Sequence, residues 1–171
     1  FSYTANGGVI PNIDATALPT IDTTVATFTG VTISGVDSSN VPKSGNLSAG
    51  DKIKVQLFGS EVLAVTGNPT FSIDVGGVTK QATYSSGSGS STLIFYYVID
   101  AADVDGSGGI TSAAATAVSL AGGAIRDNVG NSADLSTVPD VVSGSNAVSI
   151  IVDNIAPTVN SMGITSATSK Q

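Results

Sequence analysis

The sequence predicts an all-β sandwich rather than a helical or mixed fold. Short runs of β-branched and apolar residues recur along the chain, and clusters of Gly, Ser, Asn and Asp separate them. The periodicity of an amphipathic helix is almost absent. With 171 residues, the chain is long enough to bury one sizeable core.

Three local patterns define the clearest strands. Within Asp51–Phe58 apolar and polar residues alternate, which predicts a half-buried strand with one solvated face. The pair Gly76-Gly77 lies between two further runs and predicts a two-residue hairpin, because both glycines tolerate a positive φ. Thr92–Ile99 is continuously apolar, so we expect a central strand that is buried on both faces.

In chain order, the expected strands are Phe28–Val36, Asp51–Phe58, Glu61–Thr66, Thr70–Val75, Val78–Tyr84, Thr92–Ile99 and Ala147–Val152. Between the last two, Ala113–Ala117 is compatible with a short helical turn, whereas Val118–Leu120 has an extended pattern. Ala124-Ile125 precedes a turn at Asp127–Asn131. Seven or more short strands with turn residues between them indicate an immunoglobulin-like β-sandwich.

The two ends of the chain differ from the body. Phe1–Thr27 is irregular and contains two prolines, so we expect an extended leader or linker. The sandwich is expected over Phe28–Thr158. Val159–Gln171 repeats the pattern of Phe28–Asn40 at an offset of 131 positions. A restarted first strand has two explanations: the start of a following repeat, or a donor strand that completes a neighbouring subunit.

Composition excludes several function classes. Acidic residues outnumber basic ones 13 to 6 and the net charge is −7, which argues against nucleic acid or an anionic membrane surface as a partner. No apolar run is long enough for membrane insertion. The absence of Cys and His removes disulfides, thiolate metal sites and the commonest general base, so we do not expect an enzyme. Few aromatic residues and abundant Ser and Thr are typical of an exported, extracellular protein.

An acidic loop is the best local candidate for a metal site. It contains Asp100, Asp103 and Asp105, followed by glycines that let the backbone curl. Carboxylates at this spacing can converge on one Ca²⁺, which prefers oxygen ligands. The alternative is a solvated acidic turn whose side chains bond to their own backbone. The pattern of an EF-hand is missing, because no Glu follows at the twelfth position.

Three stretches carry a family resemblance. They are AGDKIKVQLFGSEVLAVTGNPTFSIDVGGVTKQATYSSGSGSSTLIFYYVI, AGGAIRDNVGNSADL and VSIIVDNIAPTV, in that order. Together they resemble the bacterial immunoglobulin-like repeats of large extracellular adhesins, which are similar in architecture to cadherin domains. The resemblance covers roughly Phe28–Val159. It implies a cell-surface location and a tandem array of like domains.

The resemblance also implies a second, dispersed set of calcium ligands. The segment VDNIAP resembles the linker of cadherin-type repeats, where carboxylates and Asn side chains of consecutive domains share Ca²⁺. Carried over, Asp153 and Asn154 are linker ligands, and Glu61 and Asp127 contribute from the end of the domain. The alternative is that Asp153 and Asn154 only cap a turn before proline.

The sequence therefore predicts a non-enzymatic, Ca²⁺-stabilised structural protein of the cell surface. It is expected either as one tandem repeat of an adhesin or as a self-assembling subunit of a filament or surface layer. The partners are like domains or copies of the chain itself. The alternative is a carbohydrate- or ligand-binding module in which the acidic loop and its calcium form the sugar site. That alternative requires at least two aromatic residues exposed on one face.

Overall fold

The computed structural model describes residues 4–5, 8–9, 21–106, 108–112, 116–141, 150–160 and 163. These residues form an all-β structure with one 3₁₀ turn, η2 (Leu135–Thr137), and without an α-helix. Near the N-terminus, β1 (Thr4–Ala5) pairs with β2 (Gly8–Val9) in an antiparallel arrangement. In the part of the chain described, no helix is long and apolar enough to cross a membrane.

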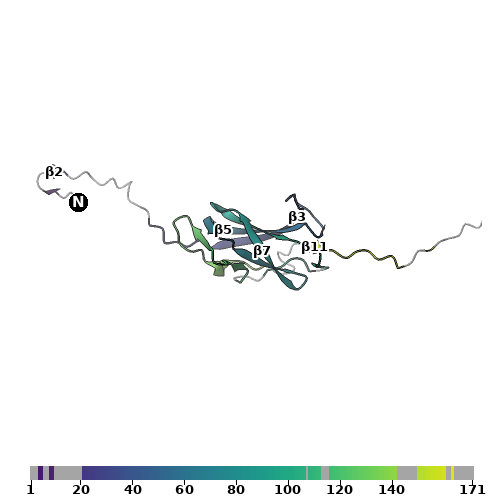
Figure 1. The fold of residues 1–171 in the computed structure, drawn as a ribbon. Helices are drawn as coiled ribbons and strands as arrows, with labels where there is room; N and C mark the ends of the chain where they lie inside the picture. The colour runs from purple at the N-terminus through teal and green to yellow at the C-terminus, as the bar shows by residue number, and fades with distance from the viewer. Residues whose placement is uncertain are drawn as a thin grey trace, which may run out of the picture.

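One antiparallel sheet makes up most of the body (Figure 1). Its order is β10-β5-β8-β7-β6-β9, and β3 also pairs with β5. The strands are β3 (Phe28–Val36), β5 (Lys52–Thr66), β6 (Thr70–Val75), β7 (Val78–Ser86), β8 (Ser90–Val98), β9 (Val118–Ser119) and β10 (Ala124–Asp127). A separate parallel pair joins β4 (Asn46–Leu47) to β11 (Ile151–Val152).

Strand β5 is long because its two halves pair with different neighbouring strands. Its first half pairs with β3 on one side and β8 on the other. The register with β8 shifts between Phe58 and Leu63, and the strand then pairs with β10. The two strands expected at Asp51–Phe58 and Glu61–Thr66 are thus one strand with an irregularity between them. Such an irregularity bends a strand and re-aims its side chains.

The core shows that the sheet curls on itself. The ring centroid of Phe95 on β8 lies 5.9 Å from that of Phe71 on β6 and 5.7 Å from that of Tyr84 on β7. Phe71 and Phe95 are both fully buried, although β7 lies between their strands. The two halves of the sheet therefore face each other across one hydrophobic core. This arrangement is consistent with a β-sandwich.

Two local predictions have different outcomes. The hairpin is confirmed: β6 and β7 pair up to Val75 and Val78, and Gly76 and Gly77 have φ values of 60° and 86°. The prediction that the strand at Thr92–Ile99 is buried on both faces is wrong. Leu93 and Phe95 are fully buried, but Val98 is 55% exposed, so β8 has one solvated face. Its outward apolar residues lie beside polar side chains of neighbouring strands rather than in a second core.

The later strands follow the expected pattern where the structure describes them. Val118 and Ser119 are extended in β9, and Ile151 and Val152 form β11. Residues 113–115 of the predicted helical turn and residues 147–149 of the last predicted strand lie outside the described residues.

The chain enters and leaves the body at opposite ends (Figure 1). Part of the predicted leader belongs to the packed unit, because Ala26 is fully buried and its carbonyl accepts the N–H of Asp134. At the other end, residues 153–160 continue beyond β11 without a strand. Of the predicted repeated strand, only Val159, Asn160 and Gly163 are described, and none of them is in a strand.

The aromatic contacts in the core predict a large stability difference between neighbouring positions on β8. We expect Phe95→Ala to lower the free energy of unfolding by about 4 kcal/mol, because it leaves a cavity beside two rings. Val98→Ala, at an exposed position of the same strand, is expected to cost less than about 0.5 kcal/mol. Urea denaturation of both variants measures this difference. Equal losses would show that Phe95 does not lie in the core.

Candidate metal centre

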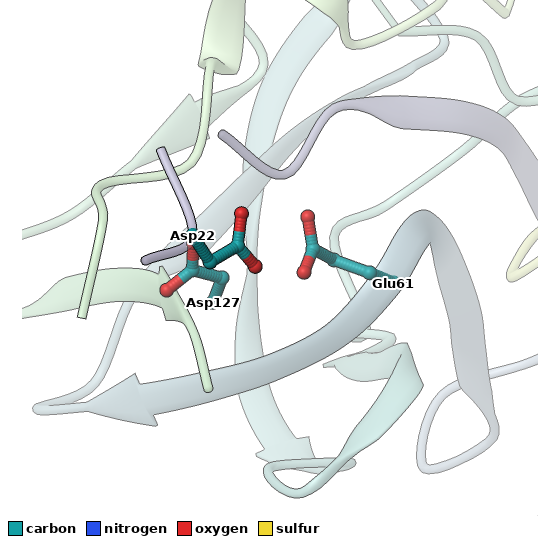
Figure 2. A group of neighbouring side chains, drawn as sticks. All are labelled: Asp22, Glu61 and Asp127. Atoms are coloured by element: carbon teal, nitrogen blue, oxygen red, sulfur yellow. The ribbon is translucent and has the colours of Figure 1, made fainter. Parts of the chain in front are cut away.

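Three carboxylates from distant parts of the chain converge at one end of the body (Figure 2). Asp22 precedes β3, Glu61 lies in the irregular part of β5, and Asp127 ends β10. One oxygen of each side chain lies within 4.8 Å of the others. Figure 2 shows the Glu61 carboxylate pointing toward those of Asp22 and Asp127. The sequence predicts Glu61 and Asp127 as ligands, but not Asp22.

Strand pairing brings Asp127 beside Glu61. In the register of β10 with β5, Asp127 lies opposite Leu63, which is two residues beyond Glu61. Leu63 is fully buried, and the irregularity between Phe58 and Leu63 separates Glu61 from the regular alternation of the strand. The bend in β5 therefore determines where the Glu61 side chain lies.

Asp127 is the rigid member of the cluster. It is only 1% exposed, and its Oδ1 accepts the backbone N–H groups of Val129, Gly130 and Asn131 at 2.7–3.0 Å. Its Oδ2 accepts the side-chain amide of Asn131 at 2.7 Å. Burial by itself would raise the pKa of Asp127, but these donors outweigh it and hold the pKa below its usual range. Asp127 is therefore ionised at neutral pH.

Asn131 attaches the N-terminal segment to the same site. Its side-chain amide also donates to the backbone carbonyls of Asp22 at 3.1 Å and Thr24 at 3.3 Å. Asp22 Oδ1 in turn accepts the N–H of Thr24 at 2.9 Å. These bonds hold residues 22–24 against the turn after β10, so the Asp22 carboxylate is placed by the fold.

Among the described residues, no ion pair neutralises this cluster. The two ion pairs among the described residues, Lys43–Asp51 and Lys80–Asp103, lie elsewhere. The nearest basic residue in sequence, Arg126, donates to the Gly130 carbonyl and the Ser132 hydroxyl instead. Three like charges at close range repel one another, and a bound cation would offset this repulsion.

The spacing fits a hard divalent cation. Ca²⁺ binds oxygen ligands at about 2.4 Å, so two ligands on opposite sides of the ion are about 4.8 Å apart. The three oxygens lie within that limit of one another and are able to contact a single ion. Three carboxylates leave room for backbone carbonyls and water, which commonly complete a calcium shell.

The acidic loop predicted as a calcium site has internal partners. Asp103 is only 3% exposed, and it forms an ion pair with Lys80 at 2.6 Å. It also accepts the Tyr97 hydroxyl at 2.5 Å and the N–H of Asp100 at 2.8 Å. Burial opposes ionisation, yet Lys80 and Tyr97 hold the pKa of Asp103 below its usual range. Sequence reasoning missed Lys80, because β7 brings it close only in the fold.

The other two residues of this loop join it to the rest of the body. Asp100 Oδ1 accepts the N–H of Ala102 at 3.1 Å, which makes a local turn. Asp105 is buried, and its backbone exchanges two hydrogen bonds with Val152 of β11.

The two linker residues predicted from the resemblance lie where the chain leaves the body. Asn154 Oδ1 accepts the N–H of Ala49 at 2.7 Å, and its amide donates to the carbonyls of Asp100 and Asp103. Asp153 Oδ1 accepts the N–H of Ile155 at 3.0 Å. The predicted ligands thus form two groups. Glu61 and Asp127 lie with Asp22 at one end, and the other five residues lie around the segment after β11.

Comparison with known proteins finds no match: no family model, no curated protein and no solved structure resembles this chain. The assignment of the acidic cluster therefore depends on its own geometry and charge.

The Lys80–Asp103 pair predicts a specific pH dependence of stability. Because the pKa of Asp103 is lower in the folded state than in the unfolded state, its contribution is complete above about pH 4 and is lost as the pH falls below that value. At pH 7 we expect Asp103→Asn to cost about 2 kcal/mol, the size of a hydrogen bond to a charged group.

Urea denaturation at pH 7, 5 and 3 measures this effect. The difference in unfolding free energy between the wild type and Asp103→Asn is expected to become smaller toward the lowest pH. The difference between the wild type and Lys80→Gln is expected to become smaller over the same range. A difference that stays constant with pH would contradict the assigned ion pair.

Proposed function

We propose that this chain carries an immunoglobulin-like repeat of an extracellular structural protein, stabilised by Ca²⁺ bound to Asp22, Glu61 and Asp127. The work of such a repeat is to extend and stiffen a cell-surface adhesin or filament. The observation that carries this proposal is the meeting of three carboxylates at the end where the chain enters the body.

The strand order supports the immunoglobulin-like topology. If the two-residue strands β1, β2 and β4 are left out and β3, β5, β6, β7 and β8 are taken as strands A to E, then the order β3-β5-β8-β7 corresponds to A-B-E-D. Constant-type immunoglobulin domains have this order in one of their sheets. The pairing of β6 with β9 corresponds to strands C and F of the opposite sheet.

A tandem arrangement is supported by both ends of the unit. The chain enters at one end of the body and leaves at the other, as consecutive repeats in an extended array require (Figure 1). The 131-residue offset that relates Val159 to Phe28 also relates Asp153 to Asp22 and Thr158 to Thr27. A unit that follows at this spacing would receive Asp153 at the position that Asp22 occupies here.

Calcium at this site would stiffen the connection between units. Asp22 belongs to the incoming segment, whereas Glu61 and Asp127 belong to the body. An ion held by all three would neutralise their repulsion and attach that segment to β5 and β10. Each such ion would reduce the freedom of the chain at a junction that otherwise depends on a few hydrogen bonds.

The geometry favours a tandem repeat over a subunit completed by strand donation. Strand β3 pairs with β5 from Phe28 to Val36, so the place of the first strand is already filled by the unit's own chain. A sugar site at the acidic loop has no comparable support. Asp103 is paired with Lys80 of β7, and Tyr97 of β8 donates its hydroxyl to Asp103.

Calcium should therefore raise the melting temperature of the chain through this cluster. With millimolar Ca²⁺ in excess of a site of extracellular affinity, we expect an increase of about 5 °C over chelator. Glu61→Gln should lose most of this increase. In chelator it should melt at or above the wild-type temperature, because one of three repelling charges is gone. Differential scanning calorimetry in both buffers measures these values.

Asp153→Asn is the matched control, because it removes one carboxylate from the opposite end. In a single unit it should respond to calcium as the wild type does. The proposal is refuted if calcium leaves the wild type unchanged, or if Glu61→Gln responds fully.

A further inference from the structure

The outer face of strands β3, β5, β8 and β7 has an unusual distribution of charge. Thirteen residues of the chain are acidic, yet none of them lies in β3, β7, β8 or the Lys52–Phe58 part of β5. Lys52 and Lys54 lie on the solvated side of β5, because the residues between and after them, Ile53 and Val55, are fully buried. This surface is thus a basic face on an acidic protein.

Strand register builds a polar and aromatic row across this face. Lys54 lies opposite Ser34 of β3 and Tyr96 of β8, and Tyr96 lies opposite Thr83 of β7. Directly opposite residues have Cβ atoms about 5 Å apart, so the four side chains are direct neighbours. Lys52 Nζ lies 5.6 Å from the centroid of the Tyr96 ring. The same ammonium group donates to the Ser38 carbonyl at 2.9 Å and to Asn40 Oδ1 at 3.0 Å. The partly buried ring of Tyr96 therefore lies near the positive charge of Lys52 and directly opposite Lys54.

The side chains around this row are suited to a chain of sugars. Tyr96 offers an aromatic ring with a polar hydroxyl. Gln56 lies opposite Thr32 and Ile94 on the same face, so amide and hydroxyl groups adjoin the ring. An open sheet face of this kind fits an extended polymer better than a small molecule, because small molecules are usually held in concave pockets.

Charge decides which polymer fits. The two lysines and the absence of carboxylates favour a ligand with negative charges at regular intervals. Acidic residues that lie farther than about 8–10 Å from the two lysines repel such a ligand only weakly, because salt screens charges beyond that distance. A second copy bound through the same face is disfavoured, because a symmetric contact would bring lysines against lysines.

We propose that the outer face of β3, β5, β8 and β7 binds an anionic polysaccharide whose sugars carry carboxylates. Lys52 and Lys54 contact the carboxylates, Tyr96 stacks on a sugar ring, and Gln56 bonds to hydroxyls. This site is on the side of the sandwich and uses none of the residues of the acidic cluster. Each unit of an array would present one such face, so weak single contacts would add up through multivalency.

Affinity electrophoresis in native gels tests this proposal with the intact chain. Polygalacturonate cast into the gel is the probe, and the uncharged polysaccharide dextran is the control. Chelator in the gel keeps calcium out of the measurement, so the outcome does not depend on the acidic cluster. We expect polygalacturonate to retard the wild type, dextran not to do so, and the retardation to fall between about 20 and 300 mM NaCl.

Variants locate the site. Lys54→Gln is expected to weaken binding about threefold, the worth of an exposed ion contact. Tyr96→Ser is expected to weaken it about tenfold, because an aromatic contact is lost. Arg126→Gln is the matched control, since it removes the same charge from β10, and it should bind like the wild type. Lys54→Gln changes a solvated side chain, so the test remains valid if Tyr96→Ser does not fold.

Four outcomes would overturn the proposal. The first is that polygalacturonate does not retard the wild type, and the second is that dextran retards it equally. The third is that all variants are retarded as much as the wild type. The fourth is that the wild type migrates more slowly than a monomer should in gels without polysaccharide. The last would indicate that a second copy of the chain occupies the face.

Discussion

The bend in strand β5 is the constraint on which the rest of the structure depends. The strand pairs with β3 and β8 in its first half and with β10 in its second, and its register shifts between Phe58 and Leu63. Gly59 lies within this irregularity at a close approach, since a Cβ there would be 2.8 Å from the Leu63 side chain. Without the bend, Asp127 at the end of β10 would not lie beside Glu61. The segment that carries Asp22 would then not contact the turn after β10, to which Asn131 now attaches it. One local distortion thus joins the core, the sheet edge and the acidic cluster.

The carboxylates at the two ends of the body differ in whether a basic side chain neutralises them. Where the chain leaves, Asp103 is neutralised by Lys80, and Asn154 bonds to three separate backbone groups. At that end, Asp103 and Asn154 are therefore paired with groups of the protein itself. Where the chain enters, Asp127 is held ionised by backbone and amide donors, and two further carboxylates face it. Three carboxylates at this range repel one another, and a bound cation would offset that repulsion.

Local features were predictable from the sequence, and features that depend on long-range contacts were not. Alternation within Asp51–Phe58 and the glycine pair at Gly76-Gly77 determine a strand and a hairpin from neighbouring residues alone. The one-sided burial of β8 was missed, because its outward apolar residues are covered only in part by neighbouring strands. Asp22 was missed because its partners lie far along the chain. The 131-residue repeat offered a signal, since it pairs Asp22 with Asp153, which was already a predicted ligand.

The central proposal is a calcium site at Asp22, Glu61 and Asp127. A calcium titration of the ¹⁵N-labelled chain, followed by two-dimensional NMR of its amides, tests it most directly. We expect the largest shifts at residues 22–24, 59–62 and 127–131, which surround the three carboxylates. We expect small shifts at residues 100–105 and 153–155, where side chains already bond within the protein. Large shifts confined to those two segments would place the metal at the opposite end and contradict the assignment to Asp22, Glu61 and Asp127. A spectrum unchanged by calcium would contradict a calcium site of any kind.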